Sequence, residues 1–266
     1  MHQPNMHKSV LVTGGARRLG AELVQVFAQA GWTVWCHYQQ SNSEALVLQQ
    51  KLLQQGIQLE LVQANLAHQA EIETMMAAIL QRQGPLTAVV NNASLFEPDE
   101  GATFSAAAAR AQFDVNLIAP LLLGKLLAEQ QTAAGLSDGC VIHLLDQKVY
   151  NLNPDYFSYT LSKLALERAV ALQAQALAPV VRVCGVAPGL MYLSGPQQGE
   201  NFRLASQINL RRQATDPRDV AKSCLFMAET PSITGTTLCV DNGQHLVPLN
   251  KDVMFVVDDW LKANAV

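Results

Sequence analysis

The sequence has no Cys-x-x-Cys pair, and its five cysteines are scattered along the chain. Cysteines paired at short spacing indicate structural zinc sites, and even sets in small secreted chains indicate disulfides. We therefore expect free thiols, most of them buried, and no metal site. The cysteines are Cys36, Cys140, Cys184, Cys224 and Cys239.

The sequence also lacks a large excess of charge of one sign and a long apolar run near its start. The 18 basic and 22 acidic side chains leave a net charge of −4, which gives no electrostatic footprint for a nucleic acid. The first apolar run, Val10–Val12, follows the polar stretch Met1–His7 and is too short for a signal peptide or a membrane span. We expect a cytoplasmic protein with a small-molecule partner, and with no nucleic acid and no membrane as partners.

No linker rich in proline, glycine or serine divides the 266 residues, so we expect a single domain over residues 1–266. Short apolar runs alternate with longer segments of helical periodicity. The predicted strands are Val10–Val12, Thr33–His37, Leu59–Val62, Ala88–Val90, Cys140–Leu145, Val181–Val186 and Thr237–Val240. The predicted helices are Leu19–Ala30, Ser43–Gln55, Glu71–Gln83, a stretch near Phe113–Gln131, Tyr156–Leu177 and Asp216–Glu229. This order predicts an α/β fold of the Rossmann type, with a doubly wound, seven-stranded parallel sheet and helices on both faces.

Two segments stand outside this alternation. Residues 190–213 follow a Pro-Gly turn and fit no strand, so they are a candidate substrate loop, either a lid or an ordinary long connection. Residues 247–266 form a C-terminal extension past the last predicted strand. Their apolar side chains cover either the domain's own surface or a subunit interface.

A glycine-containing turn, Thr-Gly-Gly-Ala-Arg-Arg-Leu-Gly at residues 13–20, directly follows the first predicted strand. A strand, a turn with Gly14 and a helix N-terminus together bring backbone N–H groups and the helix dipole to a pyrophosphate. The turn also contains Arg17 and Arg18, and guanidinium groups bind phosphates in bidentate fashion. The pattern predicts a dinucleotide site with an additional phosphate.

The end of the second predicted strand lacks the carboxylate that NAD-specific sites place on the ribose 2′-hydroxyl. Residues 37–41 read His-Tyr-Gln-Gln-Ser, and the first carboxylate after them is Glu44. We expect Arg17, His37 and Ser41 to receive a 2′-phosphate instead. The predicted cofactor is therefore NADPH rather than NADH.

Tyr159 and Lys163 are one helical turn apart near the start of a long predicted helix. A tyrosine with a pKa near 10 is a slow proton donor at neutral pH. We expect the Lys163 cation to lower the pKa of Tyr159, so that the phenol exchanges a proton with a substrate while hydride arrives from a nicotinamide.

Over residues 8–246 these motifs resemble those of the short-chain dehydrogenase/reductase family. Asn91-Asn92-Ala93 is similar to the family's Asn-Asn-Ala-Gly, Asn116 matches its catalytic asparagine, and Pro188-Gly189 matches its turn beside the nicotinamide. The resemblance implies a general acid at Tyr159 and a nicotinamide-ribose ligand at Lys163. It also implies that Asn116 anchors a proton-relay water and that the protein is a homotetramer, formed through the helices near Phe113 and Tyr156.

Asp146 stands thirteen residues before Tyr159, where most members of that family have a serine that donates to a substrate carbonyl. An ionised carboxylate only accepts hydrogen bonds and repels a developing alkoxide. Asp146 therefore argues against a simple ketone or alcohol substrate. A nitrogen heterocycle suits it better, because ring N–H and amino groups donate to a carboxylate.

The chain resembles the pteridine reductases and the bacterial dihydromonapterin reductases in having Asp146 and the arginine-containing loop, and the pteridine reductases also in Asn-Ala-Ser-Leu-Phe at residues 92–96. By this resemblance, Phe96 stacks a pterin against the nicotinamide, and Arg18 contacts both the pyrophosphate and the pterin. The cofactor-binding residues implied by the motifs and the resemblance are Gly14, Arg17, Arg18, Leu19, His37, Tyr38, Ser41, Asn65, Leu66, Asn92, Ala93, Ser94, Tyr159, Lys163, Pro188 and Gly189. The implied substrate residues are Arg18, Ser94, Phe96, Asp146, Tyr159 and Leu190, and the implied catalytic set is Asp146, Tyr159, Lys163 and Asn116.

The leading hypothesis is an NADPH-dependent reductase of a pteridine C=N bond, in a dihydropterin, dihydromonapterin or dihydrofolate. A carbonyl reductase of the same family, acting on a 3-oxoacyl thioester, a sugar or a steroid, remains open. A non-catalytic NADPH sensor is the third hypothesis. Gln40 stands where pteridine reductases often have arginine, which weakens the predicted phosphate site.

Overall fold

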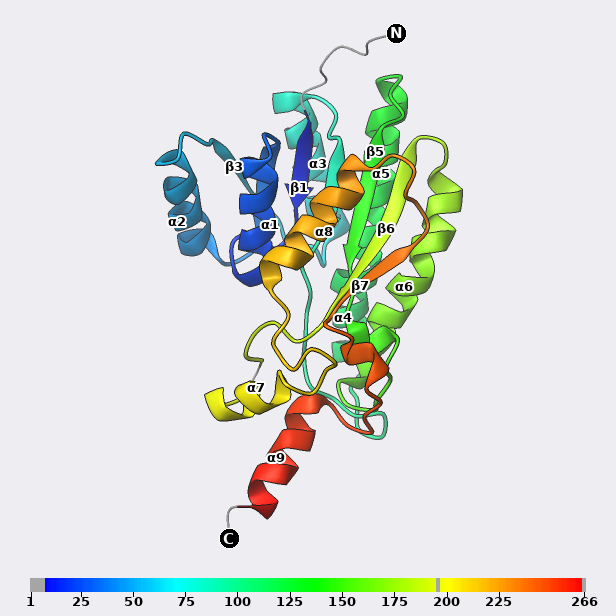
Figure 1. The fold of residues 1–266 in the computed structure, drawn as a ribbon. Coiled ribbons are helices and arrows are strands. Elements are labelled where there is room, and N and C mark those ends of the chain that lie inside the picture. Colours follow the sequence, from blue (N-terminus) through cyan, green and yellow to red (C-terminus); the bar gives the residue numbers. More distant parts are fainter. Residues whose placement is uncertain (1–7, 195–196, 265–266) are drawn as a thin grey trace.

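Seven parallel strands form one sheet in the order β3-β2-β1-β4-β5-β6-β7 (Figure 1). The computed structural model describes residues 8–194 and 197–264. The strands are β1 Ser9–Val12, β2 Thr33–Tyr38, β3 Leu59–Gln63, β4 Ala88–Asn91, β5 Gly139–Leu144, β6 Val181–Pro188 and β7 Thr237–Val240. The order reverses at β1, which pairs with β2 on one side and with β4 on the other. This is the predicted doubly wound sheet, and a crevice at the carboxyl ends of the strands is expected at such a reversal.

Helices cover both faces of the sheet, as predicted (Figure 1). They are α1 Arg18–Gln29, α2 Asn42–Leu53, α3 Gln69–Gln83, α4 Ala106–Phe113, α5 Ala119–Ala133, α6 Phe157–Leu177, α7 Gly199–Ala205, α8 Pro217–Glu229 and α9 Val253–Ala263. One core cluster joins the sheet to α1, α2 and α8, and a second joins its other face to α3, α5 and α6. Alternate residues of β1 enter the two clusters, with Val10 and Val12 in the first and Leu11 in the second. Apolar burial on both faces explains why the strands read as continuous apolar runs.

The helix predicted near Phe113–Gln131 begins earlier than expected. Ser105 accepts a hydrogen bond from the backbone N–H of Ala108, which caps an alanine-rich α4. A π-helical turn, Asp114–Ile118, then joins α4 to α5. By length and composition the joined stretch Ala106–Ala133 would be able to cross a membrane. Its α5 part packs on α3, β4 and β5, and we assign it to the core.

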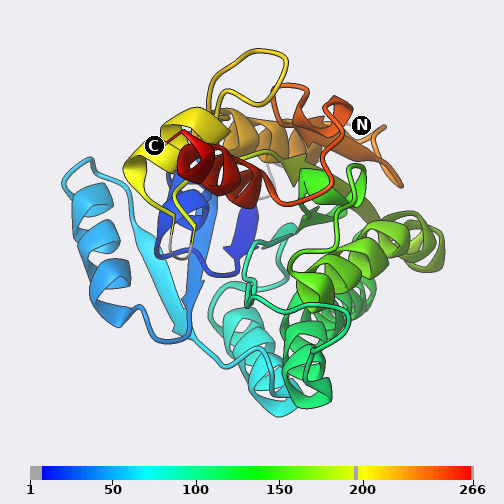
Figure 2. The ribbon, with the colours of Figure 1, turned by 90° about the horizontal axis from the view of Figure 1, so that it is seen from below.

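The two segments that fitted no pattern contain helices that pack on each other. α7 lies within residues 190–213 and α9 within residues 247–266, and the two run side by side beyond the carboxyl ends of the strands (Figure 2). Asp252 caps α9 by accepting from the backbone N–H of Met254. The C-terminal extension thus covers part of the domain's own surface. Residues 1–7, on which part of the expectation about targeting rested, lie outside the described residues, as do residues 195–196 and 265–266.

Candidate active site

A cavity of about 570 Å³ opens at the carboxyl ends of the strands, on the edge that Figure 2 faces. The turn after β1, the ends of β2, β4, β5 and β6, the start of α6 and the segment before α9 all contribute to its walls. The predicted site residues that line it are Gly14, Arg17, Arg18, Leu19, His37, Tyr38, Ser41, Leu66, Asn92, Ala93, Ser94, Phe96, Asp146, Tyr159, Lys163, Pro188, Gly189 and Leu190. Asn65 and Asn116 do not line it.

The turn after β1 requires glycine at two positions. Gly14 has a φ of +61°, and a Cβ there would lie 3.1 Å from the Cα of Ala93. A Cβ on Gly20 would lie 2.0 Å from the Gly14 carbonyl oxygen, so only glycine lets α1 start against the turn. The Asn92 side chain donates to the carbonyl oxygens of Thr13 and Gly14, at 2.9 and 3.1 Å. Asn92 thereby fixes the shape of the turn from the neighbouring strand.

His37 supports the glycine turn instead of facing a phosphate, which corrects our expectation. Its Nδ1 accepts from the backbone N–H of Gly14 at 3.1 Å, and its Nε2 donates to the carbonyl oxygen of Ala64 at 3.0 Å. Burial lowers the pKa of His37 to about 4. The imidazole is therefore neutral at physiological pH, and both ring nitrogens are already bonded.

Arg17 is the exposed cation at the end of the cavity where β2 ends. Its Nη1 lies 3.4 Å from Oε1 of Glu44, and the side chain is 63% exposed. Tyr38, Gln40 and Ser41 line the same end of the cavity. An exposed cation beside uncharged hydroxyl and amide groups fits a 2′-phosphate better than a ribose diol.

Arg18 spans the mouth of the cavity. Its Nη2 donates to the carbonyl oxygen of Leu193 at 2.6 Å, and its guanidinium lies 4.9 Å from the centre of the Tyr192 ring. Arg18 has a φ of +51°, a left-handed conformation that is costly for a residue with a side chain. The substrate loop predicted at residues 190–213 is thus bonded directly to the glycine turn.

Tyr159 and Asp146 form the centre of the site. The Tyr159 hydroxyl donates to Oδ2 of Asp146 at 2.9 Å, and the backbone N–H of Lys148 donates to Oδ1 at 2.9 Å. Asp146 lies just beyond the end of β5 and Tyr159 in the first turn of α6. Burial raises the pKa of Asp146, while the Lys148 N–H and cation and the Tyr159 hydroxyl oppose that rise.

The expectation that Lys163 lowers the pKa of Tyr159 is wrong for this structure. Burial and the adjacent Asp146 carboxylate raise the pKa of Tyr159 well above its usual value. The Lys163 ammonium donates to the carbonyl oxygen of Leu144 at 2.7 Å and lies 5.8 Å from the centre of the Tyr159 ring. Burial lowers the pKa of Lys163 to about 8, with Asp146 opposing. The phenol is therefore held protonated at neutral pH, while the raised pKa makes it a weaker acid than a free tyrosine.

Asn116 holds together two segments of the site rather than facing the cavity. Its Oδ1 accepts from the Ser94 hydroxyl and the Leu95 N–H, and its Nδ2 donates to the Leu95 carbonyl oxygen and the Ser162 hydroxyl, at 2.8 to 3.0 Å. The π-helical turn around Asn116 directs the side chain to these partners. Its amide is fully bonded within the protein, so the expected water anchor is a positioning group in this state.

The ring of Phe96 faces the cavity but is already packed on two tyrosines. It stacks on Tyr156 with centroids 4.1 Å apart and meets Tyr159 edge-on at 4.6 Å. Phe96 remains 38% exposed. Asn65, by contrast, uses its side chain to accept from the Ala67 N–H and lies away from the cavity lining.

Sequence reasoning missed several residues that the fold brings to the cavity. They are Lys148, Tyr156, Tyr192, Gln244, Asp252 and Met254. Lys148 carried a signal, because a lysine two residues after Asp146 suggests an ion pair between the two. Its ammonium instead bonds to Asp155 and Asp252. The one sequence signal at Asp252 was its place before an apolar run, which is typical of a helix N-cap and not of an active-site residue.

Known proteins are similar to this one over most of the chain. The family model described as "Enoyl-(Acyl carrier protein) reductase" matches residues 14–245. A dihydromonapterin reductase of Enterobacter sp. (strain 638) is 25% identical over 239 residues, which are 90% of this chain and 97% of that protein. A dihydromonapterin reductase of Escherichia coli (strain SMS-3-5 / SECEC) is 24% identical over 237 residues, which are 89% of this chain and 96% of that protein.

Two solved structures have the same fold at higher identity. FolM alternative dihydrofolate reductase 1 from Brucella canis, complexed with NADP, is 36% identical with a TM-score of 0.85 and covers 92% of this chain and 96% of its own. The Brucella suis protein, also in complex with NADP, is 35% identical with a TM-score of 0.80. The match covers 90% of this chain and 95% of that protein. The chain therefore belongs to the short-chain dehydrogenase/reductase family.

Proposed function

We propose that this protein is an NADPH-dependent pteridine reductase that reduces a C=N bond of a dihydropterin, dihydromonapterin or dihydrofolate. The observation that carries the proposal is the 2.9 Å hydrogen bond from the Tyr159 hydroxyl to Asp146, inside a cavity continuous with a dinucleotide turn. The names of the similar proteins, dihydromonapterin reductase and alternative dihydrofolate reductase, point to the same chemistry.

The pair of side chains suits a C=N bond for a simple reason. Reduction of C=N adds hydride to carbon and a proton to nitrogen, and NADPH supplies the hydride when it is bound. Tyr159, held protonated by burial and by Asp146, delivers the proton. Asp146 retains lone pairs to accept from ring N–H and amino groups, which a pteridine offers and a ketone does not.

The residues around the turn after β1 fit the cofactor. Gly14 and Gly20 leave room for backbone N–H groups to approach a pyrophosphate, and the exposed Arg17 is proposed to exchange its 3.4 Å contact with Glu44 for a 2′-phosphate. The Lys163 side chain extends from α6 to the Leu144 carbonyl oxygen at the end of β5, and by family resemblance it is proposed to bind the nicotinamide ribose. Phe96 is proposed to stack a pterin ring with its exposed face.

A carbonyl or enoyl reductase is the second candidate, because the matching family model carries that description. Such reactions build negative charge on an oxygen, and Asp146 at that position would oppose it. Asp146 would have to be protonated or replaced as the partner of Tyr159. A non-catalytic NADPH sensor is disfavoured by the intact pair of Tyr159 and Lys163.

We also propose a homotetramer in the cytoplasm. Large apolar side chains remain exposed on the π-helical turn and on α6, namely Ile118, Leu161 and Leu172. Exposed apolar residues on these elements favour an interface between copies. Light scattering at two protein concentrations gives the mass of the assembly and decides between monomer, dimer and tetramer.

The test of the function is a substrate panel with the purified protein. We expect oxidation of NADPH with dihydropterin, dihydromonapterin or dihydrofolate, and much slower oxidation with a 3-oxoacyl thioester, an enoyl thioester and a steroid ketone. NADH should serve poorly with every substrate. Turnover of a thioester or a ketone at a higher kcat/KM than any pteridine would overturn the proposal.

A further inference from the structure

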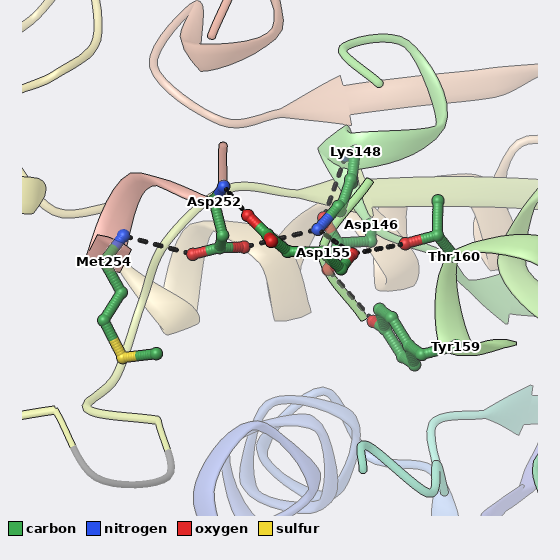
Figure 3. A network of polar contacts seen from close by, with 7 residues as sticks. All are labelled: Asp146, Lys148, Asp155, Tyr159, Thr160, Asp252 and Met254. Atoms are coloured by element: carbon green, nitrogen blue, oxygen red, sulfur yellow. Dashed lines mark hydrogen bonds and ion pairs between the residues drawn. The ribbon is translucent and has the colours of Figure 1, made fainter. Parts of the chain in front are cut away.

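Lys148 is a buried cation beside the candidate catalytic pair. Its residue is 3% exposed, and it lies on the short 3-10 helix Gln147–Val149 that directly follows Asp146. A buried ammonium is costly unless it is compensated. The ammonium donates to the carbonyl oxygen of Asp155 at 2.6 Å and lies 3.5 Å from Oδ2 of Asp252. Figure 3 marks both contacts. It also lies 5.4 Å from the centre of the Tyr156 ring.

Asp252 reaches this cation from the far end of the chain. Its Oδ1 caps α9, and its backbone N–H donates to Oδ2 of Asp155 at 2.6 Å (Figure 3). Asn201 of α7 fixes the following turn by donating to the Met254 carbonyl oxygen at 2.8 Å and to Asp258 at 2.6 Å. The segment before α9 is therefore bonded to the site on one side and to α7 on the other.

The charges around the Asp146 carboxyl come from several elements. Lys148 belongs to its own turn, Tyr159 and Lys163 to α6, and Asp252 to the C-terminal segment, while Asp155 and Tyr156 precede α6. Burial raises the pKa of Asp146, the Lys148 cation lowers it and the Asp252 carboxylate raises it. In a buried site water screens these charges less, so their effects on the pKa of Asp146 are larger than on a surface. The two partners of the ion pair thus act on Asp146 with opposite sign.

We propose that Lys148 is a positioning residue that keeps the Asp146 carboxyl ionised in the free enzyme, and that Asp252 partly offsets it, so the C-terminal segment helps to set the charge of the site. An ionised Asp146 accepts hydrogen bonds from the N–H and amino groups of the substrate and keeps Tyr159 protonated until hydride transfer. The consequence for turnover rests on the proposed function. The effect of Lys148 and Asp252 on the charge of Asp146 is independent of the proposed function.

The first test needs no substrate. Protein labelled with 13C at the aspartate carboxyl carbons is titrated by NMR, with Asp146→Asn used to assign the Asp146 signal. We expect the Asp146 midpoint to rise by about one pH unit in Lys148→Met and to return in Lys148→Arg, since a nearby cation lowers a carboxyl pKa by about 1 to 3 units. In Asp252→Asn, whose single carboxamide oxygen can still cap α9, the midpoint should fall because the negative charge beside Lys148 is lost. Shifts of opposite sign are not expected from simple loss of structure.

The second test uses the pH profile of kcat/KM with NADPH and the best pteridine. The acidic limb should move to higher pH in Lys148→Met and to lower pH in Asp252→Asn, with less than about threefold change on the alkaline side. The matched control is Lys251→Met, which breaks the exposed Lys251–Asp259 pair in the same segment and should leave both profiles unchanged.

The outcomes separate the two proposals. An unchanged Asp146 midpoint in Lys148→Met, or shifts of the same sign in both variants, overturns the role of Lys148. If Lys148→Met does not fold, the Asp252→Asn titration decides alone, and a midpoint that stays or rises there counts against the inference. A wild-type protein inactive on every pteridine contradicts only the proposed function, because the NMR titration stands without it.

Discussion

The Tyr159 hydroxyl donates a hydrogen bond of 2.9 Å to Oδ2 of Asp146, and so a phenol is paired with a carboxylate where a hydroxyl is usual in the family. The pairing raises the pKa of Tyr159, since a phenolate beside a carboxylate in a buried site is unfavourable. The phenol therefore keeps its proton at neutral pH, although it is a weaker acid than a free tyrosine. A protonated phenol agrees with a reductase, which must supply a proton with the hydride.

Removing the phenol oxygen should abolish most of the turnover. In Tyr159→Phe we expect kcat to fall by about 10²- to 10⁴-fold, the usual contribution of a positioned general acid. NADPH binding, measured by fluorescence titration, should change by less than about threefold, because the ring and its packing on Phe96 remain. A variant that keeps a tenth of the wild-type kcat would contradict the assignment.

Replacing Asp146 by serine should exchange one substrate class for another. Hydrogen bonds to a charged group contribute about 1.5–3 kcal/mol, so Asp146→Ser should lower kcat/KM for a pteridine by about 10- to 100-fold. A serine donates to an oxygen, and slow reduction of a ketone should appear in the same variant. Asp146→Asn, which keeps the shape but not the charge, is the matched control and should lose pteridine turnover without gaining the ketone. Equal pteridine turnover in wild type and Asp146→Ser would sink the substrate argument.

Arg17 should decide between the two dinucleotides. Loss of a charge-assisted hydrogen bond in Arg17→Gln should raise KM for NADPH by about tenfold or more and leave KM for NADH within about twofold. Glu44→Gln should act in the opposite direction, because Glu44 lies 3.4 Å from Arg17 and competes with a phosphate for it. The exposed Lys125, paired with Glu129 away from the cavity, provides the control Lys125→Gln. The same loss for both dinucleotides in Arg17→Gln would contradict this role.

Stability should fall as the pH is lowered from 6.5 towards 4. Burial lowers the pKa values of His37 and His143 to about 4, whereas an unfolded histidine titrates near 6.5. Between these values the unfolded chain binds protons that the folded chain does not, so each histidine destabilises the fold by about 2 kcal/mol at pH 5. The measurement is urea unfolding at pH 7 and at pH 5.

The variant His143→Gln isolates this effect. Glutamine can keep the bonds to Asn91 and Gln173 but does not titrate, so the loss of stability between pH 7 and pH 5 should shrink by about 2 kcal/mol. The exposed His68, paired with Glu71, gives the control His68→Gln with an unchanged loss. A loss as large in His143→Gln as in wild type would show that His143 is not the cause.

Much of the fold could be predicted because its signals are local. Apolar runs between helical segments predicted the seven strands and their order of succession, and the glycines of the turn after β1 predicted a dinucleotide site. α7 and α9 were not predicted, since short helices are stabilised by the surfaces they cover rather than by their own sequence. The alanine-rich start of α4 was visible, but its continuation through a π-helical turn was not.

The candidate site was predicted unevenly for the same reason. Tyr159 and Lys163 were found from their spacing, and Asp146 from its distance to Tyr159. The direction of the Tyr159 pKa shift was predicted wrongly, because the sequence does not show that Asp146 contacts the phenol while Lys163 turns to Leu144. His37 was likewise expected at a phosphate, although its ring supports the glycine turn.

The sequence by itself determined the α/β class, the glycine turn and the identity of the groups that carry the chemistry, since periodicity and short motifs are properties of neighbouring residues. The tertiary structure decided what each group contacts. It alone brought Asp252 to Lys148 across 104 residues and buried the carboxyl and the phenol together. Charge and protonation depend on burial and on such distant neighbours, and for that reason they cannot be read along the chain.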